Sequence, residues 1–200
     1  MIEKKKELCN FCALLYNRQL TVSAGGNMSI RVGDKIIITP SGKNKGFLKP
    51  EDLVVLDLNG NVLEGGKPSI EKSFHLAYYR CRPEINAVVH CHPLHCTALA
   101  VKNEAIKPDL TPEGILLLGH VPMVPYFTPG SIELSNAVEK EVGFNVILLE
   151  KHGALTCGKS LEEAYNRMEE LEFQAKLQLL IPNTNSLPND EILKLKEMKL

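Results

Sequence analysis

The sequence predicts an α/β fold in which a sheet with many antiparallel pairs is covered by helices on both faces. Two observations support this prediction. Near the N-terminus, short β-branched runs are separated by Gly- and Asn-containing turns, which is typical of β-hairpins. Later in the chain, segments with apolar residues at helical spacing alternate with further short apolar runs. With 200 residues, the chain is long enough for one domain with a substantial hydrophobic core.

The N-terminal part should form one helix followed by two hairpins. Residues up to about Arg18 have the spacing of an amphipathic helix. In that helix, Cys9 and Cys12 are expected to pack as ordinary core residues rather than to form a C-x-x-C redox or zinc motif. The strands expected after the helix are 28–32, 35–39, 53–58 and 62–63, with turns at Gly33-Asp34 and Asn59-Gly60.

The middle of the chain should hold a helix, a buried strand and a second helix. The first helix begins after Pro68, with Ser69 as a plausible N-cap and Glu71 in the first turn. The β-branched run 85–92 is predicted to be a buried strand, with a helix over 94–101 behind it. The five prolines between residues 103 and 130 predict a loop with short strands in that stretch.

The C-terminal part should add two helices and one strand. Ser131 is expected to start a helix, and the apolar run 146–149 to form a strand. Ser160-Leu-Glu-Glu163 is a capping box that opens a long helix reaching about Leu180. We therefore expect one domain over residues 1–181. The tail over 182–200 has little core-forming potential, and partial disorder is expected there.

Composition excludes several classes of function and location. The net charge of −1 gives no electrostatic attraction to nucleic acid or to anionic membranes. No apolar run approaches the ~20 residues of a membrane helix, and the N-terminus lacks the apolar stretch of a signal peptide. The spacing of the six cysteines gives no disulfide framework. We expect a cytoplasmic protein with no nucleic-acid or membrane partner.

Four residues predict a metal site. His90 and His92 are two positions apart at the end of a predicted strand, so their imidazoles share one face while Cys91 faces the other way. A second predicted strand, 146–149, leads toward His152. Three imidazole nitrogens with one carboxylate, here Glu71, match the ligand preferences of zinc and similar divalent ions.

The alternative interpretation is that these histidines are scattered structural residues. A lone histidine would favour it, but a same-face pair at a strand end favours a metal site. Three neighbouring residues have plainer expected roles. His75 should pack near the site or form a hydrogen bond with a neighbour, and Lys151 should point away from the metal. His95 should either support the metal ligands from behind or be structural.

Two loops and a helix start predict an anion site beside the metal. The turns 24–27 and 39–42 can direct backbone N–H groups at an anion, and Asn27 and Ser41 add side-chain donors. Ser69 lies at a predicted helix N-terminus, which also attracts phosphate. Each signal is weak alone, because small turn residues are usually only turns. Together with a metal, they indicate a pocket that binds a phosphate and a Lewis acid.

Five strings in order, AGGNMSIR, TPSG, PSIEKSFH, VHCHPLHCTA and KHGALTCG, resemble the class II aldolase/adducin family, and most closely its L-fuculose-1-phosphate aldolase branch. The resemblance covers roughly residues 5–178. It implies a single three-layer αβα domain around a mixed, largely antiparallel sheet, and a homotetramer with active sites between subunits. It also implies zinc-dependent, reversible cleavage of a ketose 1-phosphate, L-fuculose 1-phosphate or similar, into dihydroxyacetone phosphate and an aldehyde.

The same resemblance assigns roles to individual residues. It implies that His90, His92 and His152 hold Zn²⁺, with another divalent transition metal as the alternative. It implies that Glu71 binds the metal at rest and serves as the catalytic base. The phosphate-binding positions that it implies are Asn27, Ser41, Gly42 and Ser69.

The sequence also departs from the family pattern. Ile70 replaces the second of two phosphate-binding serines, and Thr111 occupies the position of the acid-supplying tyrosine. Glu113 is a candidate proton donor in its place, because it resembles the glutamate in that loop of the methylthioribulose-1-phosphate dehydratases. That dehydratase, a pentulose-phosphate 4-epimerase and a non-catalytic adducin-like scaffold are the alternative functions. The scaffold is disfavoured because all four metal-site residues are present.

Overall fold

The two N-terminal hairpins form one half of a single sheet. The computed structural model describes residues 1–181 and 183–198. The strands β1 (Asn27–Val32), β2 (Lys35–Ile38), β3 (Val54–Asp57) and β4 (Val62–Glu64) pair antiparallel in succession. Gly33 and Gly60 take positive φ values in the two turns, as the predicted hairpins require.

The other half of the sheet continues from β1. The strand β5 (Ala87–Cys91) pairs antiparallel with β1 and with β8 (Gly153–Gly158), and β8 pairs antiparallel with β7 (Val146–Leu149). The short β6 (Met123–Val124) is parallel to β7 and lies at the edge. The strand order is β4-β3-β2-β1-β5-β8-β7-β6, so the predicted mixed, largely antiparallel sheet is confirmed.

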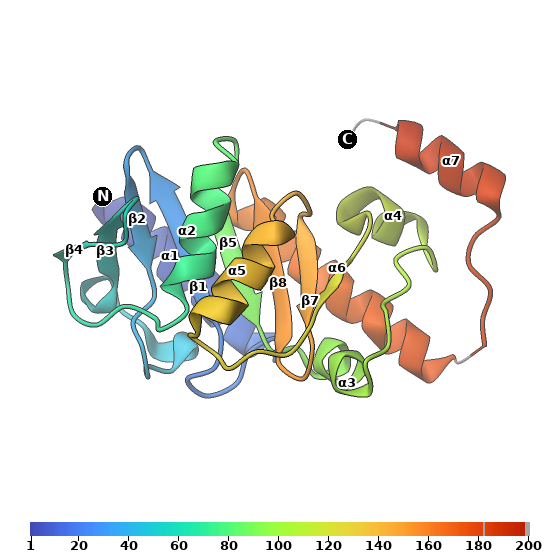
Figure 1. Ribbon diagram of the computed structural model, residues 1–200, viewed down its shortest axis with the longest axis horizontal. Helices are drawn as coiled ribbons and strands as arrows, with labels where there is room; N and C mark the ends of the chain where they lie inside the picture. Colours follow the sequence, from blue (N-terminus) through green and yellow to red (C-terminus); the bar gives the residue numbers. More distant parts are fainter. Residues whose placement is uncertain (182, 199–200) are drawn as a thin grey trace.

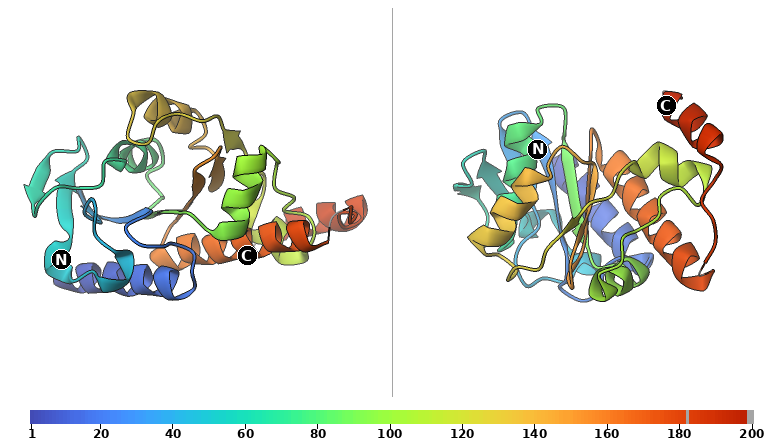
Figure 2. Two further views of the ribbon diagram at one scale, coloured as in Figure 1. Left: turned by 90° about the horizontal axis from the view of Figure 1, so that it is seen from below. Right: turned by 45° about the vertical axis from the view of Figure 1, so that its right-hand side comes forward.

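Helices cover both faces of the sheet, which confirms the predicted three layers. One face carries α1 (Ile2–Asn17), α3 (Leu94–Lys102) and α6 (Leu161–Leu180), and the other carries α2 (Lys72–Cys81) and α5 (Ile132–Lys140). Figure 1 shows α2 and α5 in front of the strands, and the left view of Figure 2 shows the sheet between the two helical layers. Two short 3₁₀ turns, Lys45–Phe47 and Pro50–Asp52, lie between β2 and β3.

Each face of the sheet has its own hydrophobic core. Cys91 is buried on the face of α1 and α6 with Cys9 and Cys12, and these cysteines carry free thiols in the described chain. The expected packing role of Cys9 and Cys12 is therefore confirmed. Val88 is buried in the cluster of the α2 and α5 face. Strand alternation puts His90 on the same face as Val88, opposite to Cys91 as predicted.

Two helices lie where the sequence predicted little regular structure. The proline-rich stretch contains α4 (Pro112–Leu118), and the tail contains α7 (Asn189–Glu197). Pro112 is the first residue of α4, where its missing N–H costs no hydrogen bond, and Thr111 caps the helix through its hydroxyl. The prolines therefore marked a helix start as well as loops. None of the side chains of α7 is buried, in line with the predicted weak core. Residues 182, 199 and 200 of the predicted tail lie outside the described residues.

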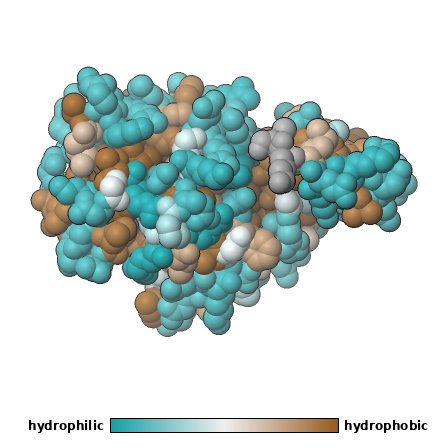
Figure 3. Space-filling model, turned by 90° about the horizontal axis from the view of Figure 1, so that it is seen from above, coloured by the Kyte–Doolittle hydropathy of each residue, from teal (hydrophilic) through white to brown (hydrophobic). Residues whose placement is uncertain are grey.

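The face shown in Figure 3 is largely hydrophilic, with hydrophobic side chains in separate patches. In the described part of the chain, no helix has both the length and the apolar character needed to cross a membrane.

Candidate metal centre and substrate pocket

Three histidines converge beside the central strands. His90 is the fourth residue of β5, and His92 follows the last residue of that strand. His152 lies in the tight turn between β7 and β8 rather than at a strand end, and Lys151 before it takes a positive φ of 53°. Because β8 pairs with both β5 and β7, this turn brings His152 beside the strand pair that carries the other two imidazoles.

The geometry of the three imidazoles suits one shared ion. Their ligand nitrogens all lie within 4.8 Å of one another. The Nε2 atoms of His90 and His92 are 3.0 Å apart. Two nitrogens bound to one tetrahedral zinc ion at ~2.0–2.1 Å are roughly 3.3 Å apart, close to this separation.

The protonation of these imidazoles also suits metal binding. Burial lowers the pKa of His92 to about 4, and burial also lowers the pKa of His90 and of His152 below the ordinary value. All three rings are therefore neutral near pH 7. In His90, Nδ1–H donates to the carbonyl of Ala154 at 2.9 Å, which leaves the lone pair of Nε2 directed at the site.

Glu71 lies next to two of the three histidines. Its Oε2 lies 3.6 Å from Nε2 of His90, and its Oε1 lies 3.5 Å from Nε2 of His152. Asn27 donates a 2.8 Å hydrogen bond to Oε2, whereas Oε1 has no hydrogen-bond partner among the described residues. Burial raises the pKa of Glu71, and the bond from Asn27 partly opposes this. A buried carboxylate oxygen without a partner fits a bound cation.

The helix that carries Glu71 begins slightly later than predicted. Ser69 was expected to cap it and Glu71 to lie in its first turn, but α2 starts at Lys72 and Glu71 occupies the N-cap position. A turn in which the N–H of Lys72 donates to the carbonyl of Ser69 precedes the helix. The hydroxyl of Ser69 accepts from the N–H of Glu71 at 3.2 Å, so Ser69 still fixes the backbone of that residue.

All predicted phosphate-binding residues line the same pocket as three of the four metal-site residues. This pocket has a volume of about 400 Å³. Its lining includes Asn27, Ser41, Gly42 and Ser69 together with Glu71, His92 and His152. The backbone N–H groups of Ser41 and Ser69 do not face it, because they donate to the carbonyls of Lys67 and Thr39. The hydroxyls of these serines are the groups left for a phosphate.

Lys45 is a pocket residue that the sequence analysis missed. Its side chain is only 1% exposed. Its ammonium donates to the carbonyl of Ala24 at 2.9 Å and to that of Lys43 at 2.8 Å, so it links the first predicted anion loop to the residue that follows the second. A lysine in a polar loop is normally exposed, and nothing in the local sequence indicates its burial. The one signal in the sequence that could have pointed to an anion-binding role for Lys45 was its position shortly after the loop TPSG.

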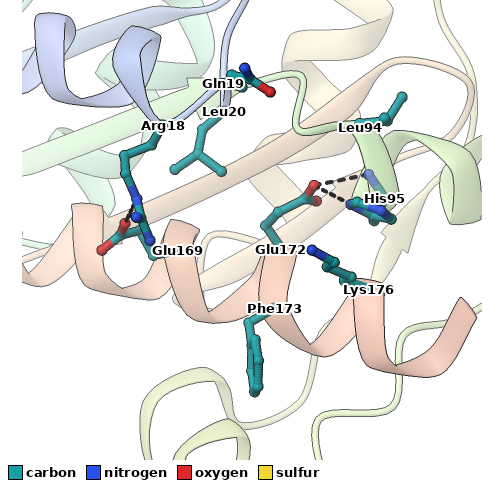
Figure 4. Close-up of a pocket in the computed structure, with 9 residues that line it drawn as sticks. All are labelled: Arg18, Gln19, Leu20, Leu94, His95, Glu169, Glu172, Phe173 and Lys176. Carbon is teal, nitrogen blue, oxygen red and sulfur yellow. Dashed lines mark hydrogen bonds and ion pairs between the residues drawn. The ribbon is translucent and has the colours of Figure 1, made fainter. Parts of the chain in front are cut away.

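The remaining predicted residues have structural positions. His75 forms hydrogen bonds with Ser29 and Asn27, and Lys151 is exposed and pairs with Glu150, both as expected. His95 donates from Nδ1 to Glu172 at 2.7 Å (Figure 4). The same carboxylate accepts from the backbone N–H groups at the start of α3, so His95 is structural as predicted.

The hollow shown in Figure 4 lies apart from the metal-site residues. It has a volume of about 290 Å³ and is lined by residues of the α1 end, α3 and α6. Its charged groups mostly pair with one another: Arg18 with Glu169 at 2.6 Å, and His95 with Glu172. It therefore presents little free charge for a ligand.

One predicted catalytic residue does not reach the pocket within one chain. Glu113 lies in the first turn of α4, is exposed and does not line the pocket. Thr111, at the position of the family tyrosine, accepts hydrogen bonds from the backbone of Gly114 and, at 2.6 Å, from Gln174. The role of Glu113 stays a prediction that requires a second copy of the chain.

An αβα fold with three histidines converging beside a polar pocket is the arrangement that the comparisons with known proteins can now be set against. Residues 6–179 match the Class II Aldolase and Adducin N-terminal domain, so the chain belongs to the class II aldolase/adducin family. Members of this family are metal-dependent, and membership supports a lyase that acts on sugar phosphates.

Similar proteins carry more than one activity in their names. An L-fuculose phosphate aldolase of Methanocaldococcus jannaschii is 45% identical over 176 residues, which is 88% of this chain and 96% of that protein. A 3-oxo-tetronate 4-phosphate decarboxylase of Haemophilus influenzae is 40% identical over 169 residues, or 81% of this chain and 80% of that protein. The solved structure of a candidate aldolase/epimerase/decarboxylase from Escherichia coli matches with a TM-score of 0.93 and 33% identity, covering 98% of this chain and 99% of that one.

Proposed function

We propose that this protein is a zinc-dependent aldolase that reversibly cleaves a ketose 1-phosphate, L-fuculose 1-phosphate or similar, into dihydroxyacetone phosphate and an aldehyde. The observation that carries the proposal is that one pocket is lined both by Glu71, His92 and His152 and by residues of the two predicted anion loops. The similarity to the L-fuculose phosphate aldolase of Methanocaldococcus jannaschii supports the choice of substrate class.

The residues present fit a zinc ion. His90, His92 and His152 offer three neutral nitrogens, and Oε1 of Glu71 is an unpaired buried oxygen. Another divalent transition metal is the alternative, because imidazole suits several of them. When bound, the ion supplies Lewis-acid polarisation of the substrate carbonyl.

The side chains of the chain itself provide binding and proton transfer. Asn27, the hydroxyls of Ser41 and Ser69, and the backbone of Gly42 bind the phosphate and fix the reacting carbons by remote binding energy. Glu71 moves the proton at carbon 3 of the ketose through Oε1, the oxygen that Asn27 leaves free. Retro-aldol cleavage also needs a base at the hydroxyl of carbon 4, which is the role that we assign to Glu113 of a neighbouring subunit in the proposed homotetramer.

A specific observation favours a second candidate, decarboxylation of a 3-oxo sugar-acid phosphate. Glu71 is the one carboxylate among the described residues that line the pocket. Loss of CO₂ from a carboxylate β to a ketone needs no base at a hydroxyl and only one proton at carbon. One acid–base group therefore suffices. The 40% identity to the Haemophilus influenzae decarboxylase agrees with this chemistry. The dehydratase alternative depends on Glu113, which does not line the pocket, and the scaffold is disfavoured because all four metal-site residues are present. The epimerase alternative is supported only by the name of the similar Escherichia coli structure.

A paired assay separates the two candidates. Zinc-loaded protein is incubated with dihydroxyacetone phosphate and a panel of aldehydes, and new sugar phosphates are measured. In parallel, it is given 3-oxo-tetronate 4-phosphate, and release of CO₂ is measured. New sugar phosphates support the aldolase. CO₂ release without aldol products identifies the decarboxylase, and the absence of both products contradicts the proposal.

The metal assignment has its own test. His92→Ala should lose most bound metal, because a chelate of three nitrogens weakens greatly when one is removed. His95→Ala is the matched control, since His95 bonds to Glu172 and should leave the metal content unchanged. Full metal retention in the His92 variant would contradict the assignment.

A further inference from the structure

A ladder of polar side chains connects α2 with β1 behind Glu71. His75 and Tyr79 are four residues apart on one face of α2, and Glu71, the N-cap residue, precedes His75 by the same spacing. Asn27 and Ser29 are two residues apart on one face of β1. Four helical residues rise about 6 Å and two strand residues about 6.6 Å, so the two rows stay in step.

Each rung of this ladder is a hydrogen bond. Asn27 donates to Glu71 at 2.8 Å, and Nε2 of His75 contacts Oδ1 of Asn27. The hydroxyl of Ser29 lies 2.7 Å from Nδ1 of His75 and 2.7 Å from the hydroxyl of Tyr79. Asn27, Ser29, His75 and Tyr79 are each at most 3% exposed. Buried groups of this kind hold one arrangement, because water cannot replace a lost partner.

Glu71 sets the direction of every bond in the ladder. An ionised carboxylate only accepts, so Asn27 must present its NH₂ group to Glu71 and its carbonyl oxygen to His75. Nε2 of His75 must then carry the proton, and Nδ1 must accept from Ser29. Ser29 in turn accepts from the hydroxyl of Tyr79. A flipped amide at Asn27 would place an oxygen against the carboxylate and an NH₂ group against an imidazole N–H.

We propose that His75, backed by Ser29 and Tyr79, is a positioning residue that locks the amide of Asn27 and thereby leaves Oε1 of Glu71 as the one free carboxylate oxygen among the described residues that line the pocket. His75 does not itself line the pocket, and its hydrogen bonds go to Asn27 and Ser29 rather than to the metal-site nitrogens. It acts through Asn27 alone. This inference rests on the proposed function, in which Oε1 transfers the proton.

Two substitutions at one position separate positioning from packing. In His75→Gln, the side-chain NH₂ reaches about as far as Nε2 and keeps the bond to Asn27 while losing the bond to Ser29. In His75→Asn, the shorter amide keeps a group near Nδ1 for Ser29 and loses the bond to Asn27. Tyr79→Phe removes the distant end of the ladder and leaves the His75–Asn27 contact in place.

The measurements are kcat and KM of the zinc-loaded variants, their metal content and melting temperature, and the visible absorption spectrum of the Co²⁺-loaded proteins. His75→Asn should lower kcat roughly 10–100-fold, the range for groups that orient a site residue. It should keep its metal and KM, and it should change the Co²⁺ spectrum because Glu71 is no longer fixed. His75→Gln should have a kcat and a Co²⁺ spectrum close to those of the parent. Tyr79→Phe should change the kcat and the Co²⁺ spectrum only slightly.

Equal loss of kcat in His75→Gln and His75→Asn would overturn the proposal and leave His75 as a packing residue. A change in KM alone would also overturn it, since that would place the effect on phosphate binding by Asn27. If the parent protein proved inactive in both assays of the proposed function, that function would fail. The Co²⁺ spectra of the three variants would still decide whether His75 positions Glu71.

Discussion

The imidazole of His92 packs against the α-carbon of Gly25. A methyl group on Gly25 would lie 2.9 Å from Nδ1 of His92 and 3.1 Å from the carbonyl of Val22. Gly26 has a φ of +69°, and a methyl group there would lie 2.5 Å from the carbonyl of His90. The Gly-Gly pair, which the sequence suggested as an anion loop, therefore also sets the position of the metal-site histidines.

This contact predicts that Gly25→Ala weakens metal binding more than folding. The added methyl group must push the ring of His92 aside, because the carbonyl of Val22 blocks movement the other way. Metal affinity should fall roughly 10–100-fold, as for other changes that reorient a ligand. Competition with a chromogenic chelator measures this affinity. Gly66→Ala is the control, since a methyl group there meets no atom within 4 Å. Unchanged affinity in Gly25→Ala would show that His92 has room to move.

Lys45→Met should weaken phosphate binding without loss of metal. The ammonium of Lys45 uses two of its three N–H groups on carbonyls and has one left for an anion in the pocket that it lines. Loss of a hydrogen bond between charged groups should raise KM for a phosphorylated substrate roughly 10–100-fold. Lys43→Met is the control, because that side chain is exposed and pairs with Asp52. Equal KM values in the two variants would mean that Lys45 only links two backbone segments and does not bind the phosphate.

The sequence predicted features that depend on local pattern. The same-face pair of His90 and His92 follows from strand periodicity, and the N-cap at Ser160 follows from helix end chemistry. The predicted capping box is only half formed, because the side chain of Glu163 accepts from the N–H of Lys159. The burial of Lys45 and the ladder behind Glu71 depend on how segments far apart in sequence pack. The spacing of His75 and Tyr79 after Glu71 was visible in the sequence, but its match to β1 was not, because strand and helix can align in several registers. The same applies to the position of Glu113 on α4, away from the pocket lining, which also depends on how distant segments pack.

The stability of the metal-free protein should fall as the pH is lowered below about 6.5. Burial lowers the pKa of His75 to about 3, whereas in the unfolded chain it is about 6.5. Between these values the unfolded state binds a proton that the folded state does not, so the free energy of unfolding is greatest above pH 6.5 and decreases toward pH 3. Each histidine with a pKa lowered in this way contributes about 1.4 kcal/mol per pH unit to the slope of the free energy of unfolding against pH.

Denaturant titrations of chelator-treated protein at several pH values measure this slope. Between pH 6 and pH 4, the free energy of unfolding of His75→Gln should change less steeply with pH than that of the parent, by about 1.4 kcal/mol per pH unit, since glutamine does not titrate. His92, with a pKa lowered to about 4, contributes in the same direction in both proteins, so the comparison isolates His75. Identical slopes for the two proteins would mean that His75 takes up its proton in the folded state.

Glu71→Gln should keep its metal while losing catalysis. Three imidazoles remain to hold the ion, and the glutamine can still accept a hydrogen bond from Asn27 through its carbonyl oxygen. The amide has no basic oxygen to move a proton, so kcat should fall by the ~10²–10⁴-fold typical of a removed general base. Metal analysis and kcat are measured together, with Glu139→Gln on the exposed face of α5 as the control. If instead the variant lost its metal and excess metal restored activity, Glu71 would be a ligand only. The base would then be sought elsewhere, and Glu113 of a neighbouring subunit is the first candidate.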